Sequence, residues 1–471
     1  MKYDHDAIVI GLGPAGMAVS IMGAEMGLNV CAIERRFIGG ECMNIGCIPS
    51  KSLLSMARAR ADVARLEEMA MAPLPSPEVR DPFGRIADYI RYINDAKNSK
   101  MFEKVNLILG EGSAEFLDPH TVAVGERRMT ARRFYIGTGT RPAMPPIPGL
   151  DQIDDVLTNE NIFSLDRVPE SMVIIGGGAI GCEMAQAFTR LDCRCTIVHK
   201  DPRLLPLADP DLGEALEAAF QREGIPVHSG RQIKEIARLA DGQVALRTKE
   251  GEELVGERLL VAAGRAQVFD GLGLDKAGVK FSRNGIEVDR HLRTSQRHIY
   301  AVGDCNGYSQ FTHAAMHQGM LALMNSMIPG PFKRDYKKYV TPWTVFTTPM
   351  ISQVGRTRAQ LEKAGAKFEE ITVRYEDYGA AIAENIAEGF VSAYISPSGR
   401  ILGAKVVGEG SGEMIGQWAL AIQKKLRITD IMMLQHSFPT MSFMSKQVSE
   451  KWMMGKMKSK SLQTLCRFMF R

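Results

Sequence analysis

The sequence predicts an α/β protein built on two Rossmann-like dinucleotide-binding domains. Two glycine-rich turns each follow a short apolar run: residues 7–10 precede Gly11-Leu12-Gly13-Pro14-Ala15-Gly16, and residues 173–175 precede the turn at 176–181. Each turn leads into residues at helical spacing and then a second apolar run, which is the βαβ context that a dinucleotide fingerprint requires. Two such units in one chain indicate two nucleotides, one held permanently and one exchanging.

The composition is that of an ordinary globular protein with a basic end. Hydrophobic residues make up 45% and charged residues 24% of the 471 residues, enough for two to four domains. We find no run of about eighteen uncharged apolar residues, no leader pattern and too few cysteines for a disulfide scaffold, so we expect a cytoplasmic protein. The net charge of +4 belongs to residues 451–471, which hold six cations and no acid. No basic stretch alternates with aromatics, so we expect no nucleic-acid partner.

The first fingerprint supplies the groups that a nucleotide needs. Its glycines let the backbone approach a pyrophosphate at the N-terminus of the following helix. The second apolar run, residues 30–33, ends in Glu34, about twenty residues after the turn, where a carboxylate can bind ribose hydroxyls.

Residues 39–51 contain two cysteines, Cys42 and Cys47, at the start of a predicted helix. With a rise of ~1.5 Å per residue, an ideal helix would separate their Cα atoms beyond the ~7 Å limit for a disulfide. A bridge between them therefore requires a distorted turn, which Gly46 permits, and Pro49 suits the first turn of the helix beyond it. Because strained bridges are the reducible ones, such a bridge would be catalytic. A plain structural bridge and a pair of zinc ligands are the alternatives.

The string Gly39-Gly40-Glu41-Cys42-Met43-Asn44-Ile45-Gly46-Cys47-Ile48-Pro49-Ser50-Lys51 resembles the active-site motif of the flavin-dependent pyridine nucleotide–disulfide oxidoreductases, the family of lipoamide dehydrogenase, glutathione reductase and mercuric reductase. The resemblance implies an enzyme that passes electrons from NAD(P)H through FAD to a Cys42–Cys47 disulfide and on to a small-molecule or protein disulfide acceptor. Cys47 would be the flavin-proximal sulfur and Cys42 the interchange sulfur. Lys51 and Glu183 match the family's ion pair beside the flavin ring.

The same resemblance implies a domain order and a homodimer in which the third domain completes the other subunit's active site. The expected divisions are an FAD-binding domain at 1–150 and 271–338, an NAD(P)H-binding domain at 151–270, an α+β dimerisation domain at 339–450 and a basic amphipathic tail at 451–471. Within the dimerisation domain we expect strands near 343–347, 370–374, 388–396 and 400–407 and a helix over 412–425.

The residues that would hold the two cofactors lie in short segments that match the family's motifs. For FAD they are Gly11, Gly13, Pro14, Ala15, Gly16, Glu34, Arg35, Gly40, Glu41, Lys51, Ala114, Thr138, Gly139, Arg141, Glu183, Gly303, Asp304, His313 and Ala314. For the nicotinamide nucleotide they are Gly176, Gly178, Ala179, Ile180, His199, Lys200, Arg203, Gly264 and Arg265. Asp304 matches the aspartate that binds the ribityl chain, and no metal site is expected.

The second fingerprint differs from the first at the ribose position. Its second apolar run, residues 195–198, ends in His199 and Lys200, with Arg203 nearby and no acid in the place that Glu34 takes. An acid there would repel a 2′-phosphate, whereas cations neutralise one, so we expect NADPH in preference to NADH. The other interpretation is a solvated basic turn.

Near the C-terminus the chain departs from the family, most of whose members carry a histidine and a glutamate around a Pro-Thr-x-Ser segment. Here the segment is Pro439-Thr440-Met441-Ser442, so Phe438 replaces the histidine that handles protons and Phe443 the glutamate that orients it. A positioned acid or base is worth ~10²–10⁴ in rate, so efficient reduction of lipoamide or glutathione disulfide is not expected. His436 could substitute only if its loop shifted.

The two phenylalanines suggest an apolar pocket over Cys42 and an acceptor that needs little proton delivery. A disulfide whose thiol leaves easily is the first hypothesis. The second is a thiophilic metal ion or a quinone, although mercuric reductases usually carry a C-terminal cysteine pair and this chain has only Cys466 there. The third is a redox-sensing flavoprotein that switches a partner.

The tail combines its six cations with apolar residues such as Trp452 and Phe468. It could lie on the inner face of an anionic membrane as a peripheral contact. It could instead reach the partner's active site and present Cys466, or pack on the dimer with its lysines solvated.

Overall fold

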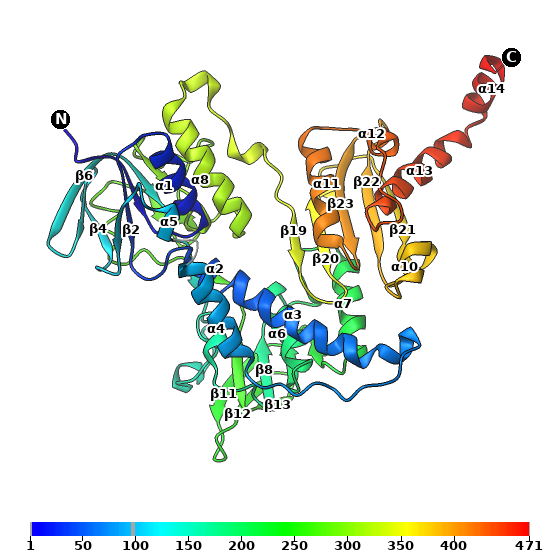
Figure 1. Ribbon diagram of the computed structural model, residues 1–471, viewed down its shortest axis with the longest axis horizontal. Helices are drawn as coiled ribbons and strands as arrows, with labels where there is room; N and C mark the ends of the chain where they lie inside the picture. Colours follow the sequence, from blue (N-terminus) through cyan, green and yellow to red (C-terminus); the bar gives the residue numbers. More distant parts are fainter. Residues whose placement is uncertain (1, 96–98, 471) are drawn as a thin grey trace.

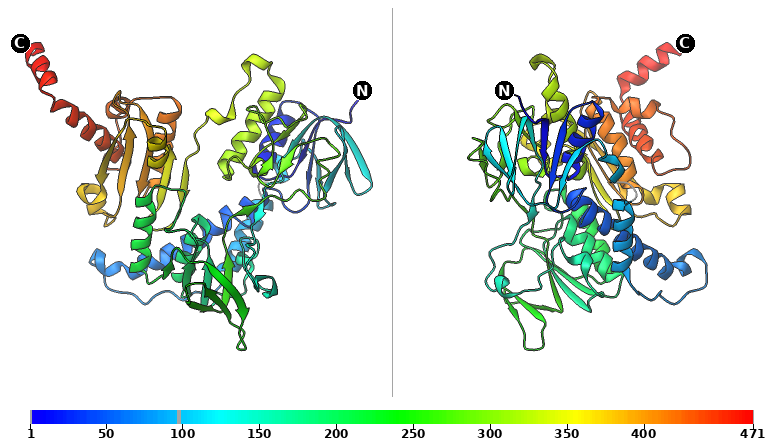
Figure 2. Two further views of the ribbon diagram at one scale, coloured as in Figure 1. Left: turned by 180° about the vertical axis from the view of Figure 1, so that it is seen from behind. Right: turned by 60° about the vertical axis from the view of Figure 1, so that its left-hand side comes forward.

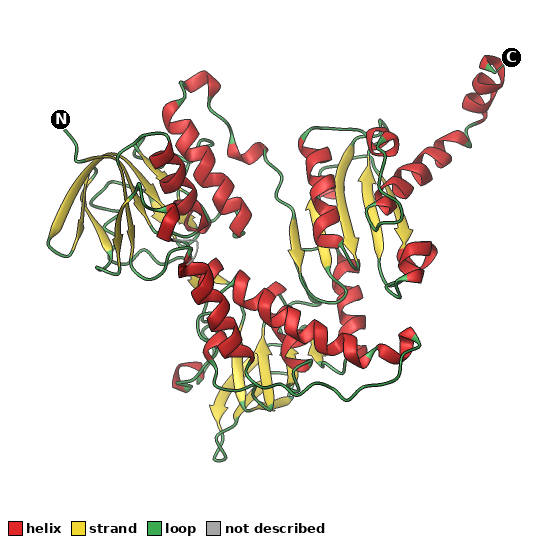
Figure 3. Cartoon of the chain, viewed as in Figure 1, coloured by secondary structure: helices red, strands yellow, loops and turns green. Residues whose placement is uncertain are grey.

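The computed structural model describes residues 2–95 and 99–470. Figure 1 shows three sheet-containing units, with a long helix crossing between the first two, and Figure 3 shows the mixture of helices and strands in each. The predicted α/β class is confirmed, with two βαβ units followed by an α+β unit.

The first unit is a parallel sheet extended by an antiparallel arm. Its strands are β1 (His5–Ile10), β2 (Val30–Glu34), β3 (Asn106–Leu109), β4 (Ala114–Asp118), β5 (Thr121–Val124), β6 (Arg127–Ile136) and β18 (Ile299–Ala301). Strands β3, β2, β1 and β6 lie parallel in that order, β18 pairs parallel with β6, and β5 and β4 continue antiparallel from β6. Helices α1 (Pro14–Glu25) and α8 (Thr312–Met327) pack together against the sheet. Residues 7–10 of β1 and 30–33 of β2 are unbroken apolar runs because both faces of these strands are buried.

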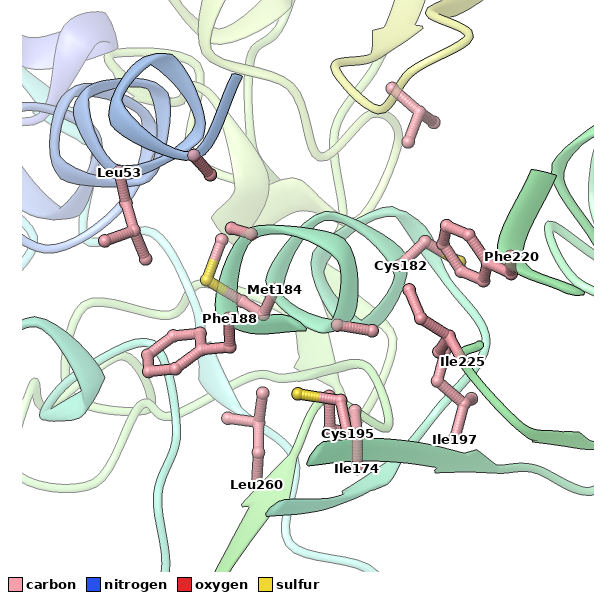
Figure 4. Packing of buried hydrophobic residues seen from close by; sticks show 14 of the residues in the cluster. Leu53, Ile174, Cys182, Met184, Phe188, Cys195, Ile197, Phe220, Ile225 and Leu260 are labelled. Carbon is pink, nitrogen blue, oxygen red and sulfur yellow. The ribbon is translucent and has the colours of Figure 1, made fainter. Parts of the chain in front are cut away.

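The second unit repeats the βαβ arrangement. Its parallel strands run in the order β10 (Val227–His228), β9 (Arg194–Val198), β8 (Ser171–Ile175), β14 (Arg258–Val261), with helices α6 (Ala179–Thr189) and α7 (Pro210–Arg222). An antiparallel sheet of β11 (Ile233–Arg238), β12 (Val244–Thr248) and β13 (Glu253–Gly256) extends it. Figure 4 shows Met184 and Phe188 of α6 between Leu53 on one side and the sheet residues Ile174 and Leu260 on the other.

The remaining helices and strands of these two units are the long helix α3 and several shorter elements. They are α2 (Gly40–Asn44), α3 (Cys47–Ala64), α4 (Pro82–Ile93), α5 (Ser99–Met101), β7 (Arg141–Pro142), β15 (Arg265–Ala266), β16 (Phe281–Ser282) and β17 (Gly285–Ile286). Helix α3 follows β2 of the first unit in the chain but buries Leu53 and Ala57 in the core of the second unit. Strand β7 pairs with β15, so the chain crosses between the units at two neighbouring points. These contacts fix the two nucleotide units relative to one another.

The third unit is an antiparallel sheet in the order β19 (Trp343–Val345), β20 (Ile351–Gly355), β23 (Ile401–Val407), β22 (Phe390–Ile395), β21 (Glu369–Arg374). Its helices are α9 (Arg358–Lys363), α10 (Gly379–Ala383), α11 (Ser411–Gln423), α12 (Ile428–Met433), α13 (Phe443–Met457) and α14 (Lys460–Met469). The four expected strands and the expected helix are present. The sequence prediction lacked β20, which lies inside the sheet, and the expected division between 450 and 451 falls inside α13. None of the described helices is long and apolar enough to cross a membrane.

Candidate active site

A cavity of about 1850 Å³ lies between the first and second units. Its lining includes Glu34 of the first unit, Lys200 of the second, and both Cys42 and Cys47. A pocket for one small ligand typically measures ~300–1,000 Å³, so this cavity has room for two nucleotides and for the cysteine pair between them.

The glycine turn after β1 brings backbone into close contact with the neighbouring strand connection. Gly11 has φ +91°, and a Cβ on it would lie 2.6 Å from the carbonyl oxygen of Gly137. A Cβ on Gly16 would lie 1.9 Å from the carbonyl oxygen of Gly11, so Gly16 packs α1 against the turn and does not line the cavity. Gly13 faces open space, which leaves the N–H groups at the start of α1 free to bind an anion.

Glu34 ends β2 at the edge of this turn. Its carboxylate accepts hydrogen bonds from the N–H of Leu12 and the N–H of Arg36, each at 2.8 Å. Two backbone donors fix the orientation of the carboxylate, and each oxygen keeps a further lone pair for a hydroxyl group. This arrangement fits the binding of ribose.

The distorted turn expected between the cysteines is present. Helix α2 ends before Gly46, and α3 begins at Cys47. Both cysteines are thiols in this structure, and the Cys47 sulfur lies 3.2 Å from the hydroxyl oxygen of Thr312 at the start of α8. A hydrogen bond from Cys42, with further help from Thr312 and the positive charge of Lys51, lowers the pKa of Cys47 to about 6. The same hydrogen bond, together with burial, raises the pKa of Cys42.

A buried ion pair stands beside the cysteines. The Lys51 ammonium donates to Glu183 at 2.7 Å, and the Glu183 side chain is almost fully buried. The other Glu183 oxygen accepts the N–H of Phe346 at 3.0 Å, and the Lys51 nitrogen lies 4.3 Å from the centre of the Phe346 ring. A cation held this firmly can stabilise negative charge that develops in the cavity.

Arg265 joins the two units at the cavity wall. It pairs with Glu41 and donates to the hydroxyl oxygen of Thr140 at 2.9 Å. It also donates to the side-chain oxygen of Asn159 at 3.2 Å. Burial raises the pKa of the neighbouring Asp304 to about 6, and the charge of Arg265 partly opposes that shift. A hydroxyl group that donates a hydrogen bond to Asp304 would therefore stabilise its carboxylate.

The second glycine turn has the same form as the first, but the three cations expected after β9 do not all bring positive charge to the cavity. His199 is only 5% exposed, and its Nε2 lies 3.0 Å from the hydroxyl oxygen of Ser229. Burial lowers the pKa of His199, so the ring is neutral and brings no charge to a phosphate. Lys200 is exposed and lines the cavity, whereas Arg203 does not line it, and Asp201 does. Only Lys200 of the three expected cations is both charged and at the cavity.

The structure brings nearly all of the expected cofactor residues to the cavity. All of them line the cavity except Gly16, Arg203 and Ala314. Ala314 is buried within α8, and its neighbours Thr312 and Ala315 line the cavity instead. The Nε2 of His313 lies 2.7 Å from the carbonyl oxygen of Pro342.

The residues in place of the acid–base pair lie on the third unit, outside this cavity. Phe438 is 72% exposed, and its ring meets the edge of the Phe443 ring at a centroid distance of 5.3 Å. His436 is held between the side-chain nitrogen of Gln417 at 3.0 Å and the carbonyl oxygen of Leu434 at 3.2 Å. The expected apolar pocket over Cys42 is therefore not formed by these residues within one subunit.

Four cavity residues with clear roles were not expected from the sequence: Thr312, Thr140, Asn159 and Phe346. Thr312 and Thr140 adjoin residues that match family motifs, so their neighbours could have drawn attention to them. Asn159 and Phe346 come from loops far away in the chain, and only the fold brings them to the site.

Family models match most of the chain. The model described as pyridine nucleotide-disulphide oxidoreductase covers residues 5–319, and the one for the dimerisation domain of that family covers residues 341–448. A mercuric reductase from Streptomyces lividans is 32% identical over 449 residues, covering 93% of this chain and 94% of that protein. A dihydrolipoyl dehydrogenase from Thermus scotoductus is 31% identical over 447 residues, covering 93% and 95%. The Cu(II) complex of the HOCl-induced flavoprotein disulfide reductase RclA from Escherichia coli superposes with a TM-score of 0.84 at 25% identity, covering 95% and 99%.

Proposed function

The chain belongs to the pyridine nucleotide–disulphide oxidoreductase family, and we propose that its acceptor is a disulfide whose thiol leaves readily. As a member of the family it is an NAD(P)H-dependent flavoprotein oxidoreductase that uses FAD, and its dimerisation domain makes it a homodimer. The observation that carries the proposal is the pair Cys42 and Cys47, with the pKa of Cys47 lowered to about 6.

The residues of the first unit fit FAD. The close approach at Gly11 and the open space at Gly13 make a cradle that any added Cβ would fill or distort, and Glu34 is oriented for a ribose. When bound, FAD supplies the two-electron carrier between the nicotinamide and the cysteines. Lys51 would hold its charge against the ring system, and Asp304 would accept from the ribityl chain.

The two cysteines have different roles in the reduction of a disulfide acceptor. The sulfur of Cys42 attacks one sulfur of the acceptor and forms a mixed disulfide, and the proton of the Cys42 thiol passes to the first departing thiolate, which leaves as a thiol. The Cys47 thiolate then attacks the Cys42 sulfur, which releases the second thiolate and closes the Cys42–Cys47 bond, so two electrons leave the protein. Since Phe438 and Phe443 replace the family's proton-handling pair, nothing at those positions protonates the departing sulfur, and low-pKa thiols are favoured as leaving groups.

The test is anaerobic titration of the purified holoenzyme with NADPH and separately with NADH. We expect a long-wavelength absorbance band from the Cys47 thiolate after two electrons, and its loss in Cys47→Ser. Because the pKa of Cys47 is about 6, the band should be present above that pH and fade as the pH falls through it. Cys42→Ser should abolish disulfide turnover, by on the order of 10³-fold or more, while the nucleotide still reduces the flavin. Bleaching of the flavin absorbance without that band would remove the disulfide from the electron path.

A thiophilic metal ion is the second candidate acceptor, because it accepts electrons without protons. The relatives named mercuric reductase and the Cu(II) complex of RclA support it. No group of three or more potential metal-ligating side chains occurs among the described residues, so such an ion would be a substrate held by the cysteine pair. Steady NADPH oxidation with Hg²⁺ or Cu²⁺, lost in Cys42→Ser, would favour this acceptor over a disulfide.

Nucleotide preference and location complete the proposal. We propose NADPH over NADH on the strength of Lys200 alone, since His199 is buried and Arg203 lies off the cavity. We place the homodimer in the cytoplasm with its tail in peripheral contact with the inner face of the membrane, because residues 451–471 combine six cations with apolar side chains and hold no acid.

A further inference from the structure

The last two helices of the chain, α13 and α14, differ in how they pack on the rest of the subunit. Helix α13 is docked on the third unit: Trp452 is only 8% exposed, the Lys451 ammonium donates to the carbonyl oxygen of Thr372 at 2.7 Å, and Lys456 pairs with Glu369. Helix α14 then projects away from the rest of the subunit, as the differently turned views in Figures 1 and 2 agree. Within the described part of the chain, no residue of this ten-residue helix is buried, and the hydrogen bond from Gln463 to the carbonyl oxygen of Met457 joins it only to the end of α13.

Helix α14 has one apolar face. Leu462, Leu465, Cys466 and Met469 recur at the spacing of one helix face, and Phe468 adjoins them. The side chains are not packed: Phe468 is 76% and Met469 is 75% exposed. The opposite face carries Lys460, Gln463, Thr464 and Arg467. Apolar side chains this exposed at a chain end indicate a surface that is covered in use.

The positive charge at α14 indicates which kind of surface covers its apolar face. Lys460 and Arg467 of α14, and Lys458 in the short connection before it, form no ion pair with any described residue, and no acid occurs in residues 451–471. Unpaired cations along one side and an apolar face on the other are the features of a helix that lies in the plane of an anionic bilayer. At about 1.5 Å per residue the helix is far too short to span ~30 Å of hydrocarbon, so it would rest at the interface.

We propose that helix α14 anchors the homodimer to an anionic lipid surface, with its apolar face among the acyl chains and its cations at the headgroups. The proposal specifies the membrane contact placed in the proposed function and is independent of the redox chemistry. Cys466 lies on the apolar face, so it should be buried when the helix binds lipid. Two identical tails in the homodimer would act together on one surface and strengthen binding.

Sedimentation of the intact holoenzyme with vesicles tests the proposal. We expect binding to vesicles that contain phosphatidylglycerol, little binding to pure phosphatidylcholine vesicles, and weakening by salt. Replacing the three unpaired cations together (K458Q, K460Q and R467Q) should weaken binding by about 100-fold, and the double change L465S with F468S should abolish it. The matched control is the same loss of charge on exposed residues of the first unit and its neighbouring loop, R128Q with K280Q and R283Q, which should leave binding unchanged.

A second readout uses Cys466 itself. Anionic vesicles should slow maleimide labelling of Cys466, followed by mass spectrometry of the tail peptide, and neutral vesicles should not. Equal sedimentation with both lipids, or equal loss in the control variant, would overturn the proposal. So would a Cys466–Cys42 crosslink between subunits, or a shift to a larger oligomer that L465S with F468S reverses. The tail variants should keep full NADPH-dependent reduction of a soluble acceptor, so failure of the anchor and failure of the redox proposal are distinguishable.

Discussion

The two nucleotide units repeat one glycine contact and differ in the side chain that follows their second strand. In the first, a Cβ on Gly16 would lie 1.9 Å from the carbonyl oxygen of Gly11; in the second, a Cβ on Gly181 would lie 2.0 Å from that of Gly176. The same glycine pattern thus builds the same contact between helix and turn. At the end of the next strand, however, the first unit presents a fixed carboxylate and the second a buried imidazole, Glu34 against His199.

The glycines of such a fingerprint can be interpreted from the sequence alone, whereas the side chain at the ribose position can be interpreted only in the folded protein. The glycines act through backbone geometry, which follows from the residue type alone. The side chain at the ribose position acts through its charge, and charge depends on burial. Two backbone hydrogen bonds orient the Glu34 carboxylate, whereas burial lowers the pKa of His199 and favours its neutral form.

The largest expected effect comes from adding a methyl group to each packed glycine. In Gly16→Ala the new Cβ cannot avoid the backbone oxygen of Gly11, so we expect FAD affinity to fall about 10- to 100-fold, the equivalent of a ~1–3 kcal/mol overpacking cost. In Gly181→Ala the protein should keep FAD and lose affinity for NAD(P)H by a similar factor. Flavin content of the purified protein and KM for the nucleotide measure the two effects.

The control for this pair is Gly455→Ala in α13, where a Cβ meets nothing within 4 Å. It should leave both affinities unchanged. Loss of FAD from the Gly181 variant, with FAD retained in the Gly16 variant, would reverse the assignment of the two units.

A smaller effect should follow from neutralising Glu34. In Glu34→Gln the amide can accept only one of the two backbone N–H groups, and its NH₂ faces the other, so we expect about 10-fold weaker FAD binding. His199→Gln is the matched change in the second unit and should alter NADPH affinity less than about 3-fold, because the ring is already neutral. Titration of apoprotein with FAD, followed by flavin fluorescence, gives the first value. Equal losses at the two sites would contradict the contrast between them.

Lys200 should decide the nucleotide preference. Lys200→Gln should raise KM for NADPH about 5-fold, the loss of one exposed charge-assisted hydrogen bond, and leave KM for NADH unchanged. Arg203→Gln is the control and should change neither value, since Arg203 does not line the cavity. A larger effect from Arg203 than from Lys200 would show that the turn rearranges around the nucleotide.

The smallest expected effect concerns pH. Because burial lowers the pKa of His199, the NADPH-to-NADH ratio of KM values between pH 8 and pH 6.5 should follow the same curve in the wild type and in His199→Gln. A preference for NADPH that rises toward pH 6.5 in the wild type alone would mean that His199 is charged when the nucleotide binds.

Much of the site could be inferred from contiguous residues. The distorted turn at Gly46 and the carboxylate at Glu34 follow from short motifs whose geometry is local. The pairing of Lys51 with Glu183, which are far apart in the chain, was expected only from the resemblance to the family. The contribution of Thr312 to the low pKa of Cys47 and the contact of Phe346 with the ion pair could not be inferred, since each joins residues that are far apart in the chain. The docking of Trp452 and the freedom of α14 were equally hidden, because both segments have the same mixture of lysine and apolar residues.

The sequence by itself determined the two βαβ units, the cysteine pair and the order of the domains, because glycine spacing and strand patterning constrain the backbone wherever they occur. Which side chains carry charge at the cavity, and which do not line it, depends on the tertiary structure. Burial, neighbouring charges and hydrogen bonds set those properties, and each of them is a sum over residues that only folding brings together.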